Sequence, residues 1–280
     1  MEKDLEKLIH DALKEDGYEK DVTSLATIET KKDAYANFFV KNSGVVSGTS
    51  ILKEIYRQIN PKIKVSILKE DGDYVNKGDV IASVYGRMND IIRGHKVALN
   101  FLQRLSGIAT ITDKFVEELK GTNCLIVDTR NNTPLLRKFE KDAVVHGKGN
   151  NSRFNLTEQV LIKDYHILVC GSITDAVLKA RSKYNSEMLI LVEVQSKEEY
   201  LEAIETSCDV VILNEMSNEQ IEDLINIPHD NIQIGVSGNI PIGRFRSIAL
   251  LGVDFIFVDC LTHSYKTLDI KFKFLQRTFK

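Results

Sequence analysis

Polar and charged side chains follow six apolar segments in the second part of the sequence, and they are of the types from which active sites are built. They are Thr129-Arg130, Lys163-Asp164, Glu193 with Gln195, Asn214-Glu215, Ser237-Gly238 and Asp259. Any one of them alone is best explained as a helix cap or a solvated charge, but the same arrangement at all six ends is harder to dismiss. In β/α barrels the carboxyl ends of the strands converge on one mouth, where catalytic residues gather. The sequence therefore predicts one mixed cationic and acidic site at these ends.

The segments that must position these residues have the pattern of buried parallel strands. Val, Ile and Leu form continuous runs rather than alternating with polar residues, at 125–129, 160–164, 189–194, 210–214, 232–238 and 255–259. Helical stretches lie between them at 173–184, 197–207, 218–226 and 242–252. Ser172, Ser217 and Pro241 are helix-start signals. This alternation predicts parallel β/α units closed into a barrel, with a doubly wound open sheet as the alternative fold.

The first part of the chain has a different pattern of expected strands and helices. Strands are expected at 34–41, 45–48, 63–69 and 80–84, with a helix over 49–59. Residues 71–86 resemble the hairpins of biotinyl and lipoyl carriers, but no lysine occupies a tight hairpin tip, so a carrier function is not expected. A long helix over 90–119, broken near Gly107, is predicted to bridge the two parts. Its apolar Ile92, Leu99, Leu102 and Leu105 indicate core or subunit contacts.

Composition and charge exclude several classes of function. The 280 residues are 43% hydrophobic and 28% charged, with a net charge of −3 and a pI of about 6.1. That balance argues against nucleic acid as a partner. No apolar run approaches the roughly 20 residues that cross a bilayer, so no membrane association is expected. The four cysteines are widely spaced, which predicts neither a zinc site nor disulfides and favours a cytoplasmic location.

Several segments, in order along almost the whole chain, resemble the quinolinate phosphoribosyltransferase family. They are ALKEDGYEKDVTS at 12–24, DGDYVNKGD at 71–79, ALNFLQRLSGIAT at 98–110, the segment at 128–153, LIKDYHI at 161–167, VEVQ at 192–195, LNEMS at 213–217, VSGN at 236–239 and GVDFIFVDCLTHS at 252–264. The segment at 98–110 is the most specific of them. This chain is identified as a member of that family, or as a divergent paralogue within it.

The resemblance implies an α/β architecture of two domains. Residues 1–110 would form an N-terminal α/β sandwich with the bridging helix. Residues 111–265 would form an incomplete parallel β/α barrel, and residues 266–280 would pack back on the N-terminal domain. The family joins quinolinate to phosphoribosyl pyrophosphate, with release of pyrophosphate and carbon dioxide. It does so in homodimers or higher homo-oligomers whose active sites two subunits share.

The resemblance also assigns roles to residues of this chain. Lys163 and Glu193 would be catalytic, and Mg²⁺ held by Glu193 and Asn214 would accompany the pyrophosphate. A pyridine carboxylate needs fixed cations, best supplied by arginine forks and lysine. The family positions that bind the acceptor are Lys96, Arg130, Arg153 and Lys163. The positions that bind the 5′-phosphate are Ser237, Gly238, Asn239 and His263.

Departures from the family pattern fall at the same places. The family has Glu-Arg at His95-Lys96, TRKT where this chain has TRNN at 129–132, GGGxNHR where it has GKGNNSR at 147–153, and glutamate at Gln195. It has aspartate at Asn214 and glycine at both Asn239 and Asp259. These changes remove cations from the acceptor pocket and anions from the ribose and metal pocket. Asp259 would in addition place a carboxylate near the expected phosphate, where like charges repel. Each lost charge-assisted contact costs about 1.5–3 kcal/mol.

Three interpretations follow from this pattern. The first is a phosphoribosyltransferase that acts on a less anionic, pyridine-carboxylate-like heterocycle, as Lys96, Asn131 and Ser152 suggest. The second is an authentic quinolinate enzyme of NAD synthesis in which Lys148 replaces a lost cation. The third is a non-catalytic binding or regulatory relative, which Asn214 and Asp259 would favour.

Overall fold

The computed structural model describes residues 2–28, 32–184, 187–229 and 231–275, and the chain divides into two compact units. Unit 1 comprises Met1–Ile111, Val145–Lys148 and Tyr265–Lys280. Unit 2 comprises Thr112–Val144 and Gly149–Ser264. Each unit has its own sheet. Unit 1 is therefore assembled from parts of the chain that are far apart in sequence.

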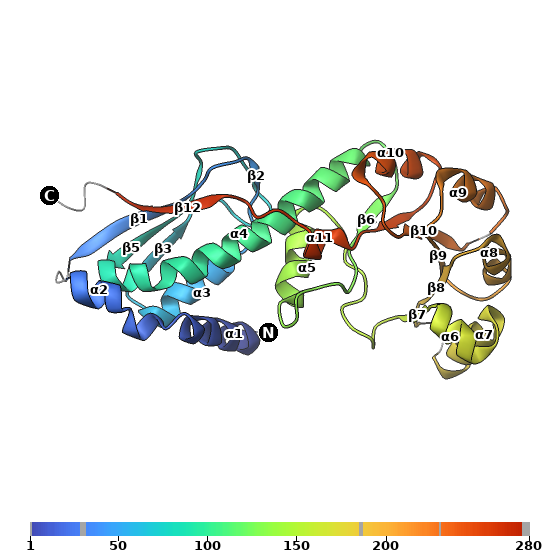
Figure 1. Cartoon of the computed structure of the whole chain (residues 1–280), viewed down its shortest axis with the longest axis horizontal. Coiled ribbons are helices and arrows are strands. Elements are labelled where there is room, and N and C mark those ends of the chain that lie inside the picture. The colour runs from blue at the N-terminus through green and yellow to red at the C-terminus, as the bar shows by residue number, and fades with distance from the viewer. Residues whose placement is uncertain (1, 29–31, 185–186, 230, 276–280) are drawn as a thin grey trace. The chain divides into compact units, whose positions relative to one another are not determined.

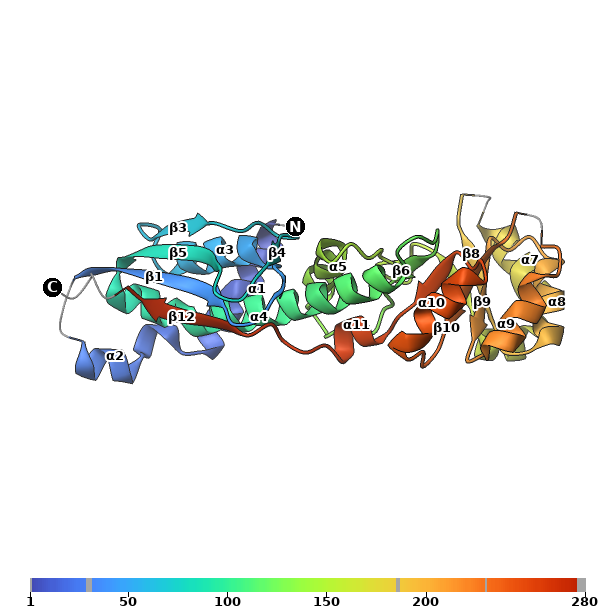
Figure 2. The same cartoon turned by 90° about the horizontal axis from the view of Figure 1, so that it is seen from above.

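Unit 1 contains a four-stranded antiparallel sheet in the order β12-β1-β5-β3. Its strands are β1 (Asp33–Val40), β3 (Lys64–Ile67), β5 (Val80–Arg87) and β12 (Ile270–Phe274), and a separate ribbon pairs β2 (Gly44–Val45) with β4 (Tyr74–Val75). In Figure 1 the red β12 runs alongside the blue β1, and Figure 2 shows β5 on the other side of β1. Alternate residues of β1, such as Ala36 and Phe38, are fully buried, so one face of this sheet carries the core.

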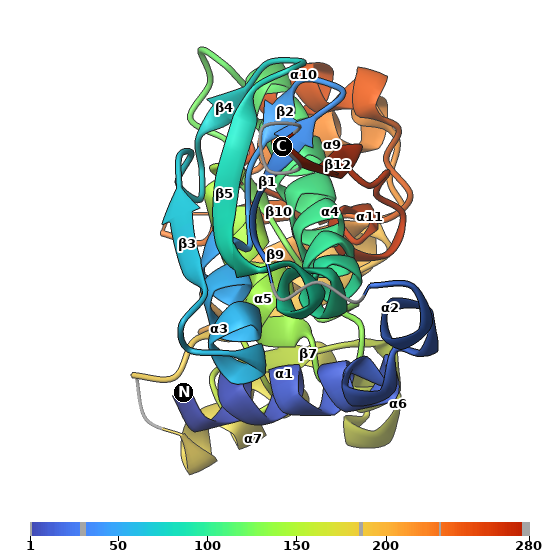
Figure 3. The ribbon, with the colours of Figure 1, turned by 90° about the vertical axis from the view of Figure 1, so that its left-hand side faces the viewer.

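Helices supply the other half of the unit 1 core. They are α1 (Glu2–Glu15), α3 (Thr49–Ile59) and the start of α4 (Met88–Glu118), whereas the short 3-10 helix η1 (Tyr18–Lys20) buries no residue and α2 (Val22–Thr27) buries Ser24. Figure 3 shows α1 and α3 side by side, and Gln58 of α3 donates to the carbonyl of Glu6 in α1. His95 of α4 lies against Phe272 of β12, which places α4 on the buried face of the sheet. Helix α3 has the bounds predicted for it.

Helix α4 is continuous through Gly107, so the predicted break was wrong. Gly107 instead allows the backbone of residues 265–267 to approach the helix closely. A Cβ at Gly107 would lie 2.7 Å from the carbonyl oxygen of Lys266 and 2.9 Å from Cα of Thr267, because residues 265–267 cross the helix there. A glycine inside a helical pattern is therefore compatible with an unbroken helix when another backbone packs against it.

Unit 2 is built on six parallel strands in the order β6-β11-β10-β9-β8-β7. They are β6 (Leu125–Val127), β7 (Val160–Ile162), β8 (Ile190–Val194), β9 (Val210–Asn214), β10 (Gln233–Ser237) and β11 (Phe255–Phe257). From β7 to β11 each strand pairs with the next in sequence, and β11 then pairs with β6. A doubly wound sheet would reverse direction along this order, so the incomplete barrel is confirmed and the doubly wound alternative is wrong.

The barrel is open between its first two strands. Strands β6 and β7 form the two edges of the sheet, and Asn150 makes an isolated parallel bridge to Val127 of β6. The amide of Asn150 donates to the carbonyl of Ile126 and its carbonyl accepts from Asp128. The loop that carries Ser152 and Arg153 therefore runs beside β6, where a further strand would close the barrel.

Helices follow the strands, as the alternation predicted. They are α5 (Arg137–His146), α6 (Asp164–Cys170), α7 (Ile173–Lys183), α8 (Lys197–Ile204), α9 (Asn218–Ile225), α10 (Ile242–Leu250) and α11 (Cys260–His263). Figure 1 shows α8 and α9 outside β8 and β9. The hydroxyls of Ser172 and Ser217 accept hydrogen bonds from the backbone amides of Asp175 and Gln220, which confirms both as helix caps. Pro241 precedes α10 as expected.

The barrel interior follows a two-residue repeat along each strand. Leu191, Val210 and Ile212 form a buried cluster against which Leu161, Phe255 and Phe257 pack. At Gly235 a Cβ would lie 2.7 Å from the Phe257 ring, so glycine makes room for that ring. These apolar groups form a floor, and the next inward residue of each strand stands above it.

No helix in the described part of the chain is long and apolar enough to cross a membrane.

Candidate active site

A cavity of about 580 Å³ lies above this apolar floor, and all of its lining residues belong to unit 2. Each strand of the sheet contributes one polar residue to the lining, and this residue lies two positions after an inward-facing residue of the same strand. These residues are Thr129, Lys163, Glu193, Asn214, Ser237 and Asp259. Parallel strands present their carboxyl ends at one edge, and side chains on one face repeat every second residue. The polar ends predicted to form one site therefore do lie around one cavity.

Lys163 and Glu193 form an ion pair across neighbouring strand ends. The Nζ atom of Lys163 lies 2.9 Å from Oε2 of Glu193. The Glu193 side chain is 14% exposed and that of Lys163 is 33% exposed, so the pair is partly shielded from water. Each group holds the other at a defined place in the cavity, and the two charges offset each other.

Two guanidinium groups stand close together on the open side of the barrel. Arg153 donates from Nη1 to the carbonyl of Gln159 at 2.9 Å. Burial, and then the positive charge of Arg130, hold the pKa of Arg153 below its usual value. The Nε atom of Arg130 is buried and has no hydrogen-bond partner. In the described chain neither guanidinium has an acidic partner, so the two together form a site for an anion.

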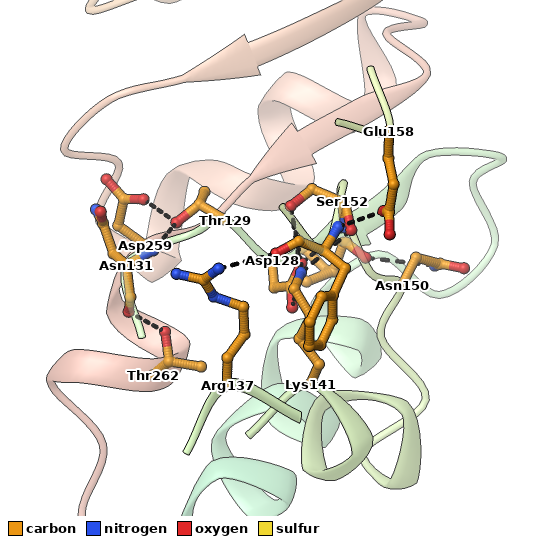
Figure 4. Close-up of polar contacts among 12 residues, drawn as sticks. Asp128, Thr129, Asn131, Arg137, Lys141, Asn150, Ser152, Glu158, Asp259 and Thr262 are labelled. Atoms are coloured by element: carbon orange, nitrogen blue, oxygen red, sulfur yellow. Dashed lines mark hydrogen bonds and ion pairs between the residues drawn. The ribbon is translucent and has the colours of Figure 1, made fainter. Parts of the chain in front are cut away.

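A buried ion pair supports the two segments that carry these arginines (Figure 4). Nζ of Lys141 on α5 lies 2.7 Å from Oδ1 and 2.9 Å from Oδ2 of Asp128. The same carboxylate accepts hydrogen bonds from the amide of Ser152 at 2.7 Å and from its hydroxyl at 3.1 Å. Burial raises the pKa of Asp128, and the Lys141 ammonium opposes that rise. Asp128 therefore ties the strand end before Arg130 to the loop before Arg153.

The turn after β10 carries the predicted phosphate-side residues. The Ser237 hydroxyl donates to Oδ1 of Asn214 at 2.9 Å. Gly238 has a φ of 119°, in the left-handed region that favours glycine. The backbone amide of Asn239 donates to Oε1 of Glu215 at 2.9 Å. The carboxylate of Glu215 therefore accepts a hydrogen bond from a backbone amide of the turn.

The end of β11 is joined to the end of β6. The hydroxyl of Thr129 donates to Oδ1 of Asp259, and that of Thr262 donates to the carbonyl of Asn131 at 2.6 Å (Figure 4). Nδ1 of His263 lies 2.6 Å from the hydroxyl of Ser264. His263 is exposed at the rim of the cavity.

The structure brings together nine of the ten residues predicted for the site. The nine that line the cavity are Arg130, Arg153, Lys163, Glu193, Asn214, Ser237, Gly238, Asn239 and His263. Lys96 lies on α4 in unit 1, where it is exposed, and it does not line this cavity. Gln195 and Lys148 also lie outside the lining.

Two features of the site are only weakly indicated by the sequence. Lys141 has the appearance of a surface lysine, yet its side chain is 3% exposed because it neutralises buried Asp128. Cys260 lines the cavity, and burial raises the pKa of its thiol. An aspartate at the end of the apolar run at 125–127 is the feature that could have pointed to a buried cation.

The comparisons with known proteins agree on one family. The family model described as "Quinolinate phosphoribosyl transferase, C-terminal domain" matches residues 108–273, and the model of the N-terminal domain matches residues 21–106. The chain belongs to the quinolinate phosphoribosyltransferase family. The resemblance stated from the sequence is thereby confirmed, and membership places the chain among the pentosyltransferases.

Individual relatives cover almost all of the chain. A probable nicotinate-nucleotide pyrophosphorylase [carboxylating] of Bacillus subtilis is 36% identical over 95% of this chain and 92% of its own. The chloroplastic nicotinate-nucleotide pyrophosphorylase [carboxylating] of Oryza sativa is 37% identical over 96% of this chain and 77% of its own. The solved structure of the nicotinate-nucleotide pyrophosphorylase of Francisella tularensis superposes with a TM-score of 0.94, at 30% identity over 98% of this chain and 97% of that one.

Within the family, the cavity accounts for two of this chain's departures. Ser152 keeps a side-chain contact to the carboxylate of Asp128, so this small residue serves the buried ion pair. Asp259 is bound to the Thr129 hydroxyl and joins the first and last strands of the barrel. Nothing in the structure explains Lys148 or Gln195.

Proposed function

We propose that this protein transfers the 5-phosphoribosyl group of phosphoribosyl pyrophosphate to a pyridine carboxylate, with release of pyrophosphate. The observation that carries the proposal is the pair of guanidinium groups, Arg130 and Arg153, without an acidic partner in the described chain. They share one cavity with the Lys163–Glu193 ion pair. Membership in the family and the names of its relatives support this reaction class.

The acceptor is expected at the arginines. A pyridine carboxylate presents a planar anionic group that an arginine fork binds with two parallel hydrogen bonds. Glu193 offsets the charge of Lys163, so the two guanidinium groups supply the net positive charge on this side. Two forks suit up to two carboxylates, which favours quinolinate as the first acceptor to test and keeps a monocarboxylate as the alternative.

The ribose is expected near Glu193. Positive charge develops on the ribose as the bond from C1′ to the pyrophosphate oxygen breaks and the bond to the ring nitrogen forms. A fixed carboxylate close to that charge stabilises the transition state more than the ground state. Lys163 holds Glu193 in position, which is the role we propose for this lysine. Both are proposed as catalytic residues.

The residues present fit a magnesium ion that arrives with the pyrophosphate. No group of three or more His, Cys, Asp or Glu side chains in the described chain is placed to hold a metal ion. Mg²⁺ in such sites commonly takes one or two protein ligands and otherwise phosphate oxygens and water. Glu193 and the Oδ1 atom of Asn214 would supply them. When bound, the ion would neutralise the leaving pyrophosphate.

The 5′-phosphate is expected at the turn of Ser237, Gly238 and Asn239, beside His263. A glycine-containing strand-to-helix turn offers backbone amides to an anion.

We also expect exposed Lys96 to act in the site of a neighbouring subunit within a homodimer or larger homo-oligomer. Mixing an inactive Lys96→Ala protein with an inactive Arg130→Ala protein tests this. Partial recovery of activity supports shared sites, and no recovery contradicts them.

The reaction is tested with purified protein, phosphoribosyl pyrophosphate, Mg²⁺ and either quinolinate or nicotinate. Pyrophosphate and nicotinate mononucleotide are followed together. Both products from quinolinate would identify a carboxylating enzyme of NAD synthesis. Product from nicotinate alone would identify an altered acceptor. Binding of phosphoribosyl pyrophosphate without turnover on a panel of heterocycles would contradict catalysis and favour a binding or regulatory role.

A further inference from the structure

The side chain of Glu215 folds over the turn that follows β10. Its Oε1 atom lies 2.9 Å from the amide nitrogen of Asn239, and its own amide donates to the carbonyl of Ser237 at 3.1 Å. A Cβ at Gly238 would lie 2.8 Å from Cδ of Glu215. Glycine at 238 therefore allows the carboxylate to lie directly on the backbone of the turn.

The backbone of Glu215 is held in an unfavourable conformation. Its φ is 56°, and the other described non-glycine residues with positive φ are Leu135 and Lys148. A glutamate in this region is uncommon, because only glycine, asparagine and aspartate adopt it readily. In this strained conformation the Glu215 carboxylate accepts the hydrogen bond from the amide of Asn239. Residues strained in this way concentrate at functional sites.

The turn is the kind of place that binds an anion, and an anion is already there. The amide of Ile240 donates within the turn to the carbonyl of Gly238, whereas the amide of Asn239 donates to a carboxylate. The Glu215 side chain is exposed and lines the cavity, so water can reach its carboxylate. Any phosphate that uses the Asn239 amide must first displace it.

We propose that Glu215 sets the affinity of the site for the donor, because its carboxylate competes with the 5′-phosphate of the donor for the amide of Asn239. The inference rests on the proposed function for the identity of the donor. It states in addition that the free protein holds its own anion in the phosphate subsite. Phosphate anions therefore bind more weakly than the turn alone would allow, and removal of the carboxylate strengthens their binding.

The test is the dissociation constant of phosphoribosyl pyrophosphate, measured by calorimetry with and without Mg²⁺ for the wild type and Glu215→Asn. Asparagine tolerates the positive φ and removes the charge. We expect binding about tenfold tighter in the variant, the effect of freeing one charge-assisted donor. Glu215→Gln keeps the side-chain volume and serves as a second variant, with a smaller gain expected.

Asp259→Asn is the matched control, because Asp259 also lines the cavity but binds the Thr129 hydroxyl rather than an amide of the turn. An equal gain in Asp259→Asn would overturn the proposal, since it would reflect net charge alone. Unchanged or weaker binding in Glu215→Asn, with unaltered thermal unfolding, would also overturn it.

Inorganic phosphate separates this inference from the proposed function. If phosphate binds Glu215→Asn more tightly and phosphoribosyl pyrophosphate binds neither protein, the competition stands and the donor assignment fails. If phosphate binding is the same in both proteins, the competition itself is wrong.

Discussion

Nζ of Lys141 and Oδ1 of Asp128 lie 2.7 Å apart, with side chains that are 3% and 0% exposed. This buried pair lies at the base of the two segments that end in Arg130 and Arg153, and Ser152 is bound to the same carboxylate (Figure 4). The guanidinium groups repel each other, so their segments need a tie that fixes their separation. The ion pair supplies that tie, with Asp128 in the lining of the cavity and Lys141 behind it.

Lys141→Met is expected to destabilise the protein by about 3–5 kcal/mol, because it leaves a buried carboxylate without its partner. The measurement is chemical denaturation followed by circular dichroism. Lys138→Met is the control on the same helix. Lys138 pairs with Asp142 at 2.9 Å, but both are nearly half exposed, so its loss should cost no more than about 0.5 kcal/mol. Similar losses in the two variants would contradict the role given to burial.

Much of the site follows from the sequence through one rule, the two-residue repeat of a strand. Leu161 and Leu191 face the barrel interior, so Lys163 and Glu193 must face it too. Glu215 breaks this rule. It follows inward-facing Asn214 by one residue, yet it lines the cavity because a φ of 56° turns the chain back over the sheet. No periodicity predicts that turn.

The remaining differences arise where distant segments meet. The sequence of α5 does not distinguish Lys141 from its exposed neighbour Lys138, because only the position of Asp128 decides which one is buried. Gly107 suggested a helix break because the crossing of residues 265–267 is not encoded locally. The patterns that predict the strands and helices lie within short stretches of the sequence. The contacts of Lys141 and Gly107 instead join residues that are distant in sequence.

Gly107→Ala should destabilise the protein by roughly 1–3 kcal/mol, because the new methyl group would collide with backbone atoms of Lys266 and Thr267. Gly243→Ala provides the opposite case. It also lies in a helix, a Cβ there would have nothing within 4 Å, and alanine should stabilise by up to about 0.5–1 kcal/mol. Thermal unfolding of both variants measures the difference in sign, and a stabilising Gly107→Ala would refute the crossing.

Arg153→Lys should raise the KM for the pyridine carboxylate roughly tenfold or more, because a point charge replaces a fork that binds two oxygens. The KM for phosphoribosyl pyrophosphate should change much less. Steady-state kinetics with each substrate varied in turn separates the two effects. Arg137→Lys is the control, since Arg137 lies over the Phe154 ring and does not line the cavity. Equal changes in both constants would argue against an acceptor-specific role.

Cys260 should react slowly with iodoacetamide near neutral pH. Burial raises the pKa of its thiol above the usual value, so the reactive thiolate is scarce until the pH rises past that raised pKa. Because the fold favours the neutral thiol, Cys260 contributes to the stability of the fold at low pH. This contribution is lost as the pH rises past the raised pKa. Mass spectrometry of the Cys260 peptide across pH gives the profile, and phosphoribosyl pyrophosphate should slow the labelling. Rapid labelling at pH 7 would show that the thiol is not shielded.

The pairing of β12 with β1 sets an order of events during synthesis. Strand β1 is made early, but its partner β12 follows only after the whole of unit 2 has emerged from the ribosome. Until then β1 is an uncovered edge strand that carries Phe38 and Phe39, the kind of edge that recruits other chains. Unit 2 is contiguous apart from one short excursion and can fold in the meantime. The growing chain therefore exposes this edge over the whole interval between the synthesis of these two strands.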